Sequence, residues 1–595
     1  MVNGFVGPVV VLQDGGRWWR YAEPERVVVA DNAAMVDEAM RAVEQAVEQD
    51  GLFAAGYLAY EAGAAYGLTA YAPAADGPPL LWFGLFRGRA EIEPPTPAGE
   101  YQFGTWRPSL EFPAYQERID RIHAAIAAGY TYQANLTFHL RADFAGAPWA
   151  LFAHLTAAQR AHYCAYIDLG RFAICSASPE LFFELDGGVL TSRPMKGTAP
   201  RGLTLADDRR QMEWLRASEK NRAENVMIVD MIRNDFGRVA RVGSVDVPAL
   251  FTVERYPTLL QMTSTVTARS DAPLADILAA TFPCASITGA PKVRTMSLLR
   301  ELEDEPRGVY TGAIGSISPG RRARFNVAIR TAVIDQAHGR AAYGVGSGIV
   351  WDSDAAAEYD ECLLKARVLE ARAGVGGDFA LLESLRWTPE EGYFLLARHV
   401  ARLLDTAEYF SFPATREGIE QALAEWAAGL SAPSKVRLLL HRDGRIAVEA
   451  APLPLAEPGP LRVALTWQPV SSADVRLYHK TTRREPYEAA RAARPDADEV
   501  ILWNERGEIT ELSTSNLVLE LDGQLVTPPV SSGLLAGTLR AEMLAAGQIV
   551  ERVVTLDDLN RVTGLWAINS VRGKRTLVLL ESALNLEPPA PTMLQ

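Results

Sequence analysis

The stretch Leu517-Val-Leu-Glu-Leu-Asp-Gly-Gln-Leu-Val-Thr527 carries the clearest structural signal in this chain. Apolar and polar residues alternate on both sides of Asp522-Gly523, and Asp-Gly is a preferred pair for a type I′ turn, so the stretch predicts a β-hairpin. Residues 564–569 and 340–345 are apolar runs of strand length, and residues 505–507 mark another reversal. Because strands and helical segments follow no regular βαβ rhythm, we expect an α+β fold built largely on antiparallel sheets.

The overall composition is that of a globular protein. Of the 595 residues, 48% are hydrophobic and 22% charged, which excludes a disordered, fibrous or coiled-coil chain. The net charge of −14 argues against binding to nucleic acid or an anionic membrane. No apolar run reaches the roughly 18 residues of a spanning helix, and the first residues lack the basic segment of a signal peptide. The four cysteines form no CxxC pair, so we expect a cytoplasmic protein without disulfides or zinc.

A glycine-rich segment predicts a linker between two domains. Glu370-Ala-Arg-Ala-Gly-Val-Gly-Gly-Asp378 follows a helical segment and precedes a strand-like stretch, which is typical of a linker. We therefore expect domains over residues 1–372 and 373–595. The proline-rich residues 451–460 are expected to divide the second domain into two lobes.

Two acidic segments of the first domain are predicted to be helices. Residues 354–369 are rich in helix formers, with Ser353 as a plausible N-cap, and residues 219–236 form the second segment. Residues 295–302 form a third helical run, which Thr288-Gly289 and Pro291 introduce.

Carboxylates on the two acidic helices are candidates for a metal site. Glu358, Glu361 and Lys365 share one helix face by their spacing, and Glu224 lies just before an apolar run. Carboxylates that converge near a core repel one another unless a cation neutralises them, and Mg²⁺ suits a site with few carboxylates and substrate oxygens. A solvated helix face with ordinary surface charges is the alternative.

Elements that favour an anion occur in the same domain. The helix start after Thr288 offers free backbone N–H groups, and Tyr343-Gly-Val-Gly-Ser-Gly-Ile-Val350 offers a backbone that a ligand can approach closely. Arg330 could hold a carboxylate through two hydrogen bonds. Taken singly, these features are also explained by tight turns and a surface ion pair. Their combination with the acidic helices indicates a metal-bridged carboxylate ligand.

Two lysines are candidate reactive groups. Lys196 stands between Pro194 and Gly197, where a turn could direct it into a cleft, and a desolvated lysine can act as a nucleophile. Lys480 is the second, because a lysine together with a glycine-containing phosphate cup, here Gly537-Thr538 before a helical run, suggests a pyridoxal phosphate site. Glu511 could pair with the protonated pyridine nitrogen. Surface lysines, a helix cap and a loop glutamate are the alternative readings.

Over roughly residues 100–370 the chain resembles the chorismate-utilising enzymes. The motifs that carry the resemblance are Tyr132-Gln-Ala-Asn-Leu136, Ser178-Pro-Glu-Leu181, Pro194-Met-Lys-Gly-Thr198, Arg222-Ala-Glu-Asn225, Arg233-Asn-Asp235, Ile287-Thr-Gly-Ala-Pro-Lys292, Tyr310-Thr-Gly-Ala-Ile-Gly315 and Glu358-Tyr-Asp-Glu361. The resemblance implies that Mg²⁺ is held by Glu224, Glu358 and Glu361. It further implies a chorismate site lined by Thr288, Tyr310, Arg330, Lys365 and the backbone of Gly346, Ser347 and Gly348.

Lys196 points to one branch of this family. Aminodeoxychorismate synthases have lysine in a similar motif, whereas anthranilate synthases have a small residue there. In the scheme that the resemblance implies, Lys196 attacks C2 of chorismate, the 4-hydroxyl leaves, and ammonia adds at C4 and expels the lysine. Gln261 stands where anthranilate synthases have histidine, and Asn221 occupies a position that is often acidic.

Residues 378–580 resemble fold-type IV pyridoxal phosphate enzymes. The supporting motifs include Leu382-Glu-Ser-Leu-Arg386, His399-Val-Ala-Arg-Leu403, Gly533-Leu-Leu-Ala-Gly-Thr538 and Asn569-Ser-Val-Arg-Gly573. The resemblance implies that Lys480 forms the Schiff base, Glu511 holds the ring nitrogen, and Arg402 with Gly537 and Thr538 holds the phosphate. The last motif and the fusion favour an aminodeoxychorismate lyase over a branched-chain or D-amino-acid aminotransferase.

The sequence therefore predicts a bifunctional enzyme of 4-aminobenzoate synthesis for folate. No cysteine lies in the Gly-x-Cys-x-Gly elbow of a glutaminase, so we expect a separate glutamine amidotransferase subunit to supply ammonia. A homodimer through the second domain is also expected from the resemblance. Two alternatives stay open: an anthranilate-type or isochorismate-type synthase joined to an aminotransferase, and a chain in which one domain is a non-catalytic scaffold.

Overall fold

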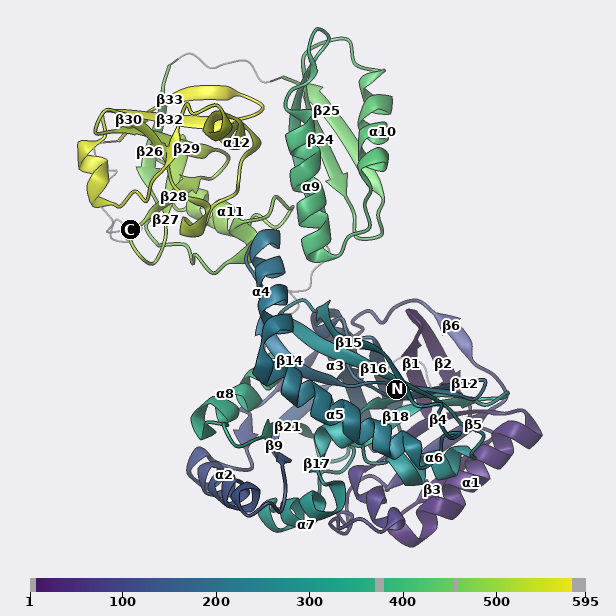
Figure 1. The fold of residues 1–595 in the computed structure, drawn as a ribbon. Coiled ribbons are helices and arrows are strands. Elements are labelled where there is room, and N and C mark those ends of the chain that lie inside the picture. Colours follow the sequence, from purple (N-terminus) through teal and green to yellow (C-terminus); the bar gives the residue numbers. More distant parts are fainter. Residues whose placement is uncertain (1–6, 370–378, 454–458, 581–595) are drawn as a thin grey trace, which may run out of the picture. The chain divides into compact units, whose positions relative to one another are not determined.

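The computed structural model describes residues 7–369, 379–453 and 459–580 (Figure 1). The chain divides into two compact units, Met1–Pro200 with Met212–Gly376 and Arg201–Gln211 with Gly377–Gln595. The expected linker, residues 370–378, lies outside the described residues, as does most of the proline-rich stretch at 454–458. The assignment of Arg201–Gln211 to the second unit was not expected from the sequence.

The first unit contains two large sheets whose strand pairs are antiparallel. One sheet has the order β17-β9-β21-β20-β11-β10-β1-β2-β6, with β7 and β8 also paired to β9. Its strands are β1 (Val9–Asp14), β2 (Arg17–Ala22), β6 (Ala90–Ile92), β7 (Tyr101–Phe103), β8 (Arg107–Pro108), β9 (Gln133–Gly146), β10 (Tyr163–Asp168), β11 (Phe172–Ser178), β17 (Gly289–Ala290), β20 (Thr331–Asp335) and β21 (Arg340–Ile349).

The other sheet has the order β14-β16-β13-β12-β19-β18-β4-β5-β3, with β15 paired to β16. Its strands are β3 (Arg26–Ala30), β4 (Phe53–Leu58), β5 (Leu81–Phe86), β12 (Leu181–Asp186), β13 (Val189–Arg193), β14 (Met195–Pro200), β15 (Asp246–Arg255), β16 (Leu259–Arg269), β18 (Ala313–Ser318) and β19 (Arg322–Val327).

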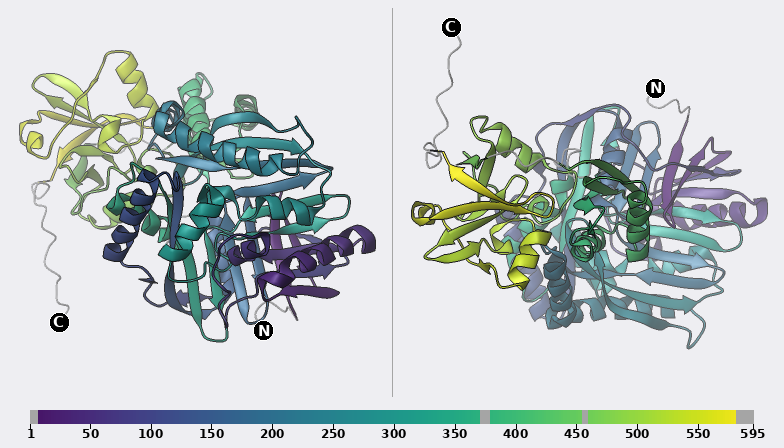
Figure 2. Two further views of the ribbon diagram at one scale, coloured as in Figure 1. Left: turned by 60° about the horizontal axis from the view of Figure 1, so that its bottom comes forward. Right: turned by 90° about the horizontal axis from the view of Figure 1, so that it is seen from above.

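Helices cover these sheets, and α1 lies at the periphery in both views of Figure 2. They are α1 (Ala33–Asp50), α2 (Phe112–Ala127), α3 (Pro148–Gln159), α5 (Glu219–Gly237), α6 (Leu274–Thr281), α7 (Lys292–Leu302) and α8 (Ala355–Ala366). A further helix, α4 (Leu205–Ala217), begins in the segment assigned to the second unit and ends in the first. Short 3-10 helices cover Tyr60–Tyr66, Ala285–Ile287 and Arg367–Leu369.

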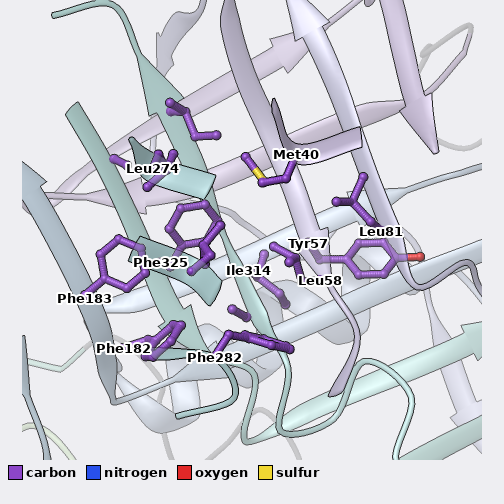
Figure 3. Packing of buried hydrophobic residues seen from close by; sticks show 14 of the residues in the cluster. Met40, Tyr57, Leu58, Leu81, Phe182, Phe183, Leu274, Phe282, Ile314 and Phe325 are labelled. Atoms are coloured by element: carbon purple, nitrogen blue, oxygen red, sulfur yellow. The ribbon is translucent and has the colours of Figure 1, made fainter. Parts of the chain in front are cut away.

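Aromatic and aliphatic side chains from both helices and strands fill the largest core (Figure 3). Phe183 and Phe325 pack with ring centroids 5.3 Å apart, and both are fully buried. Met40 of α1 and Leu274 of α6 contribute to the same cluster. Burial of one such side chain stabilises the fold by about 1.5–3 kcal/mol, so this core holds the site-bearing strands in place.

The second unit contains two further sheets. The smaller one is antiparallel, with the order β23-β22-β24-β25, and comprises β22 (Leu381–Thr388), β23 (Gly392–Tyr393), β24 (Ser434–Leu440) and β25 (Ile446–Pro452). The larger one has the order β28-β27-β26-β33-β32-β29-β30-β31. Its strands are β26 (Leu461–Leu465), β27 (Glu499–Trp503), β28 (Ile509–Leu512), β29 (Asn516–Leu521), β30 (Gln524–Thr527), β31 (Val550–Glu551), β32 (Gly564–Asn569) and β33 (Gly573–Leu579).

The larger sheet is mixed, because β26 pairs in parallel with both β27 and β33. The expected hairpin is present as β29 and β30, and both turn residues, Asp522 and Gly523, have positive φ as a type I′ turn requires. The helices of this unit are α9 (Leu396–Phe410), α10 (Arg416–Ala427), α11 (Glu485–Ala492) and α12 (Thr538–Ala545). Short 3-10 helices cover Val475–Leu477, Val530–Ser532 and Asp557–Arg561.

The segment Arg201–Gln211 is built into the second unit by specific contacts. Arg201 donates to the Tyr409 carbonyl at 2.8 Å, and the Tyr409 hydroxyl donates to the carbonyl of Gly202 at 2.7 Å. The carbonyl of Leu203 lies 3.1 Å from Nε2 of His479, the residue before Lys480. Eleven residues from the first part of the chain therefore belong structurally to the unit that carries Lys480.

No helix among the described residues is both long enough and apolar enough to cross a membrane.

Candidate active sites

Lys196 lies in β14 with its amine withdrawn from water. Burial lowers the pKa of this amine; the charge of Glu180 opposes the shift, and that of Lys365 adds to it. A Cβ atom on Gly348 of β21 would lie 3.1 Å from Lys196 Nζ and 2.5 Å from Nε2 of Gln133. The amine thus faces a strand backbone that stays open because the residue there is glycine, which leaves room beside a nucleophilic group.

Of the candidate acidic residues of α8, Glu358 contacts β21. Glu358 Oε1 accepts a hydrogen bond from Ser353 Oγ at 2.7 Å, and its other oxygen accepts from Ser347. Glu361 forms an ion pair with Lys365 at 2.7 Å. Glu358 is therefore turned towards the strand that carries the candidate ligand backbone, whereas Glu361 is exposed and pairs along its own helix.

The start of α8 differs from the expectation. Asp354 is the N-cap, because its side chain accepts from the backbone N–H of Ala357 at 2.9 Å, and Ser353 bonds to Glu358 and to the N–H of Val350. The prediction of Ser353 as N-cap was wrong. Either residue type can cap a helix, and the tertiary partner of Ser353 decided between them.

The three candidate metal ligands influence one another without converging. Burial raises the pKa of Glu224, and the charges of Glu358 and Glu361 add to this shift while that of Lys196 opposes it. Among the described residues, no three His, Cys, Asp or Glu side chains are gathered closely enough to hold a metal ion. The donor chemistry fits Mg²⁺, since mutually repelling carboxylates favour a cation, and the site stays a prediction.

Several of the expected chorismate contacts do lie together. Lys365 Nζ donates to the Gly346 carbonyl at 2.8 Å, and Arg330 Nη1 donates to the Lys365 carbonyl at 3.3 Å. The Tyr310 ring packs on β21, where a Cβ atom on Gly344 would lie 2.1 Å from its Cγ. Burial raises the pKa of Tyr310, which keeps its phenol neutral.

Thr288, an expected chorismate contact, is fully buried after a 3-10 helix. Its hydroxyl donates to the carbonyls of Cys284 and Ala285, both at 3.2 Å.

The helix that follows, α7, begins at Lys292 after the N-cap Pro291, three residues earlier than the expected start at Thr295. Lys292 itself pairs with Asp235 at 2.7 Å.

Lys480 is the candidate reactive lysine of the second unit. Burial is the main cause that lowers the pKa of its amine to about 8, and Arg402 and Arg484 also lower it, whereas Glu383 and Glu511 oppose the shift. Burial raises the pKa of Glu511 to about 7, although this carboxyl accepts hydrogen bonds from Leu535 N, Tyr487 and Asn516. A buried glutamate held in this way is suited to pair with a protonated ring nitrogen.

The candidate phosphate cup lies at the start of α12. Gly537 is the N-cap of this helix, and a Cβ atom there would lie 1.9 Å from Oδ1 of Asn516, so only glycine fits. Arg402 Nη1 donates to the carbonyl of Ala536 at 3.2 Å, which brings the guanidinium to this loop. The free N–H groups of a helix start and an adjacent arginine suit a phosphate, and so these residues fit pyridoxal phosphate.

Residues 7–371 match the family model described as chorismate binding enzyme. The chain belongs to the chorismate-binding enzymes. Residues 380–578 match a second model, described as amino-transferase class IV. The chorismate-binding unit and the class IV unit together account for both candidate sites.

Named relatives of this chorismate-binding chain fall into more than one activity class. Aminodeoxychorismate synthase component 1 of Klebsiella aerogenes is 45% identical over 258 residues, which are 43% of this chain and 57% of that protein. Anthranilate synthase component 1 of Streptomyces coelicolor is 39% identical over 287 residues, 48% of this chain and 55% of that protein. The chain thus spans about half the length of these curated relatives.

Among solved structures, anthranilate synthase component I from Streptococcus pneumoniae covers 62% of this chain and 91% of its own, with a TM-score of 0.51 and 23% identity. This likeness shows the shared fold of the chorismate-binding unit.

Two residues of the first candidate site were not named as candidate functional residues by sequence reasoning. Glu180 is buried, accepts from Ser286 Oγ at 2.6 Å, and has a pKa that burial raises to about 7. Oε1 of Gln133 is buried without a hydrogen-bond partner in the described part of the chain, beside Gly348 and Lys196. Both lie in motifs quoted for the resemblance, Ser178-Pro-Glu-Leu181 and Tyr132-Gln-Ala-Asn-Leu136, which was the available signal.

Proposed function

We propose that this chain makes 4-aminobenzoate from chorismate and ammonia in two steps, one in each unit. The observation that carries the proposal is a buried lysine amine at a candidate ligand site in each unit. Lys196 Nζ lies against Gly348 of β21, and burial lowers the pKa of both Lys196 and Lys480. A buried glutamate whose own pKa burial raises to about 7 opposes each shift: Glu180 for Lys196, and Glu511, after Glu383, for Lys480. Perturbed pKa values of this kind cluster at functional sites.

In the first step, Lys196 attacks C2 of chorismate and the 4-hydroxyl leaves as water, taking one proton. We assign that proton to Glu180, because a carboxyl with a pKa near 7 can both donate and accept at neutral pH. Ammonia then bonds to C4 and the bond from C2 to Lys196 breaks, which yields 4-amino-4-deoxychorismate and the free amine. Glu224, Glu358 and Glu361 are proposed to hold Mg²⁺, which would neutralise a substrate carboxylate.

The ammonia is proposed to come from glutamine through a separate amidotransferase subunit, as the designation component 1 of the synthase relatives suggests.

In the second step, the class IV unit cleaves 4-amino-4-deoxychorismate to 4-aminobenzoate and pyruvate. Pyridoxal phosphate would supply the electron sink when bound. Arg402, Gly537 and Thr538 are proposed to hold its phosphate, and Glu511 its ring nitrogen. Lys480 takes a proton from the substrate and returns one to the leaving enolpyruvyl carbon, and aromatisation drives release. A homodimer through this unit is part of the same proposal.

The test is a coupled assay of the full chain with chorismate, ammonium, Mg²⁺ and pyridoxal phosphate, with products resolved by chromatography. We expect 4-aminobenzoate from the wild type, no aminodeoxychorismate from Lys196→Ala, and accumulated aminodeoxychorismate from Lys480→Ala. Aminodeoxychorismate added to Lys196→Ala should still be cleaved, which controls for folding.

Two results would replace the proposal by another. Formation of 2-aminobenzoate, with activity kept in Lys196→Ala, would favour the anthranilate-type alternative. A chain that makes aminodeoxychorismate but never cleaves it, with or without pyridoxal phosphate, would make the second unit a scaffold.

A further inference from the structure

Four side chains of the second unit form one continuous buried chain of polar contacts. Thr538 Oγ1 lies 3.2 Å from His399 Nε2, and His399 Nδ1 lies 2.7 Å from Glu383 Oε2. Glu383 then accepts from Arg402 Nε at 2.9 Å and from Arg402 Nη2 at 2.7 Å. The chain therefore joins α12, α9 and β22, and it has a proposed phosphate contact at each end.

Glu383 is the centre of this chain and stays ionised. It is 2% exposed and accepts three hydrogen bonds. Burial pushes its pKa up, but Arg402 and His399 outweigh burial and hold the pKa at about 2. A fully buried carboxylate is costly unless its partners satisfy it, so its orientation and theirs are fixed together.

His399 transmits this orientation to α12. The ring is 1% exposed, and a carboxylate can only accept hydrogen bonds, so Nδ1 carries the hydrogen. This hydrogen bond fixes the plane of the ring, and it places Nε2 against the hydroxyl of Thr538, the first residue of α12.

Arg402 is anchored on one edge and extended on the other. Nε and Nη2 bind Glu383, whereas Nη1 reaches the Ala536 carbonyl in the loop before Gly537. A planar guanidinium held by two parallel hydrogen bonds cannot rotate freely, so its remaining edge stays at the cup.

We infer that Glu383 and His399 are positioning residues that set the geometry of the phosphate cup, Glu383 through Arg402 and His399 through Thr538. The inference rests on the proposed pyridoxal phosphate site. Charge alone would predict the opposite result. A carboxylate repels a nearby phosphate, so removal of the Glu383 charge would by itself strengthen pyridoxal phosphate binding. Pre-organised donors outweigh that repulsion here, since Glu383 is already neutralised by Arg402.

The experiment compares pyridoxal phosphate with pyridoxal, which lacks the phosphate. The full cofactor-free chain is titrated with each, and the absorbance of the lysine-bound ligand gives the dissociation constant. For Glu383→Gln and His399→Gln we expect pyridoxal phosphate to bind roughly 10- to 100-fold more weakly, which is the range seen when residues that orient the ligands of a metal are replaced. Pyridoxal binding should change by less than about twofold, because it does not use the cup.

Glu542→Gln is the matched control. Glu542 pairs with Arg398 at 2.6 Å, so the variant also removes a carboxylate between α12 and an arginine of α9, but outside the buried chain. We expect both ligands to bind this variant as they bind the wild type.

Other results would overturn the inference. Equal or tighter pyridoxal phosphate binding by Glu383→Gln would mean that the carboxylate acts only as a charge. An equal loss for both ligands would mean a structural role, and circular dichroism of the variants reports whether folding is the cause. A wild type that binds neither ligand would overturn the proposed function itself, a result that the variants cannot mimic.

Discussion

Two lysine amines in this molecule are easier to deprotonate than a surface lysine, and the cause in each case is burial near other cations. For Lys196 the neighbouring cation is Lys365, and for Lys480 the neighbours are Arg402 and Arg484. A neutral amine is the nucleophilic form, so both sites favour the reactive state at the expense of folding stability.

This cost leads to a prediction for Lys480. Its pKa is about 8 in the folded chain and 10.5 in a model peptide, so the unfolded state binds the proton more readily. The destabilisation is complete below pH 8 and fades as the pH rises to about 10.5. Lys480→Met should therefore stabilise the cofactor-free chain at pH 7 by roughly 1–3 kcal/mol, and the gain should vanish near pH 10.5.

Denaturant unfolding at the two pH values measures this difference, with the exposed Lys435→Met as control. A gain that persists at high pH would contradict the titration argument and point to packing alone.

At the scale of elements, one strand makes room for the first site. Gly344, Gly346 and Gly348 alternate along β21, so they share one face of the strand. Tyr310 lies against the first of them, and Gln133 and Lys196 lie against the last. Ser347, on the opposite face, contacts Glu358 of α8. The two faces of β21 therefore contact different site residues: Tyr310, Gln133 and Lys196 on one face, and Glu358 on the other.

Two alanine substitutions in β21 should have different effects. In Gly348→Ala the new Cβ meets the ends of two flexible side chains, which can move, so we expect the fold to survive. The displaced Lys196 and Gln133 should reduce aminodeoxychorismate formation roughly 10- to 100-fold. In Gly346→Ala the Cβ meets the carbonyl oxygen of Leu136 at 2.8 Å, which cannot yield as easily, so a lower melting temperature is expected.

Chromatographic assay and thermal unfolding of both variants separate these effects. Full synthase activity in Gly348→Ala would show that the amine does not use this face of β21.

At the scale of the whole molecule, two compact units have their own hydrophobic cores. Separate cores allow separate unfolding transitions, and a ligand stabilises only the unit that binds it. At 100 times its dissociation constant, pyridoxal phosphate should add about 2.7 kcal/mol, which corresponds to roughly 5–10 °C for a unit of this size. We expect calorimetry to show one transition that moves by this amount and one that does not.

The Lys480→Met chain is the control, and its transitions should move less. A single transition that shifts as a whole would mean that the units unfold cooperatively.

The sequence by itself determined the local features: the hairpin at Asp522-Gly523, the helices at Glu219–Gly237 and Lys292–Leu302 to within a few residues, and the two lysines that stand in recognisable motifs. These follow from turn chemistry, periodicity and residue type, which act over a few neighbouring positions.

Only the tertiary structure decided which distant residues meet. Gly348 lies against Lys196, and Glu383 binds both His399 and Arg402. Ser353 donates a hydrogen bond to Glu358 and does not cap the helix. Arg201–Gln211 belongs to the second unit. Such contacts depend on how strands separated by many residues align in a sheet. Local patterns carry no information about that alignment, because the same alternation is compatible with many pairings.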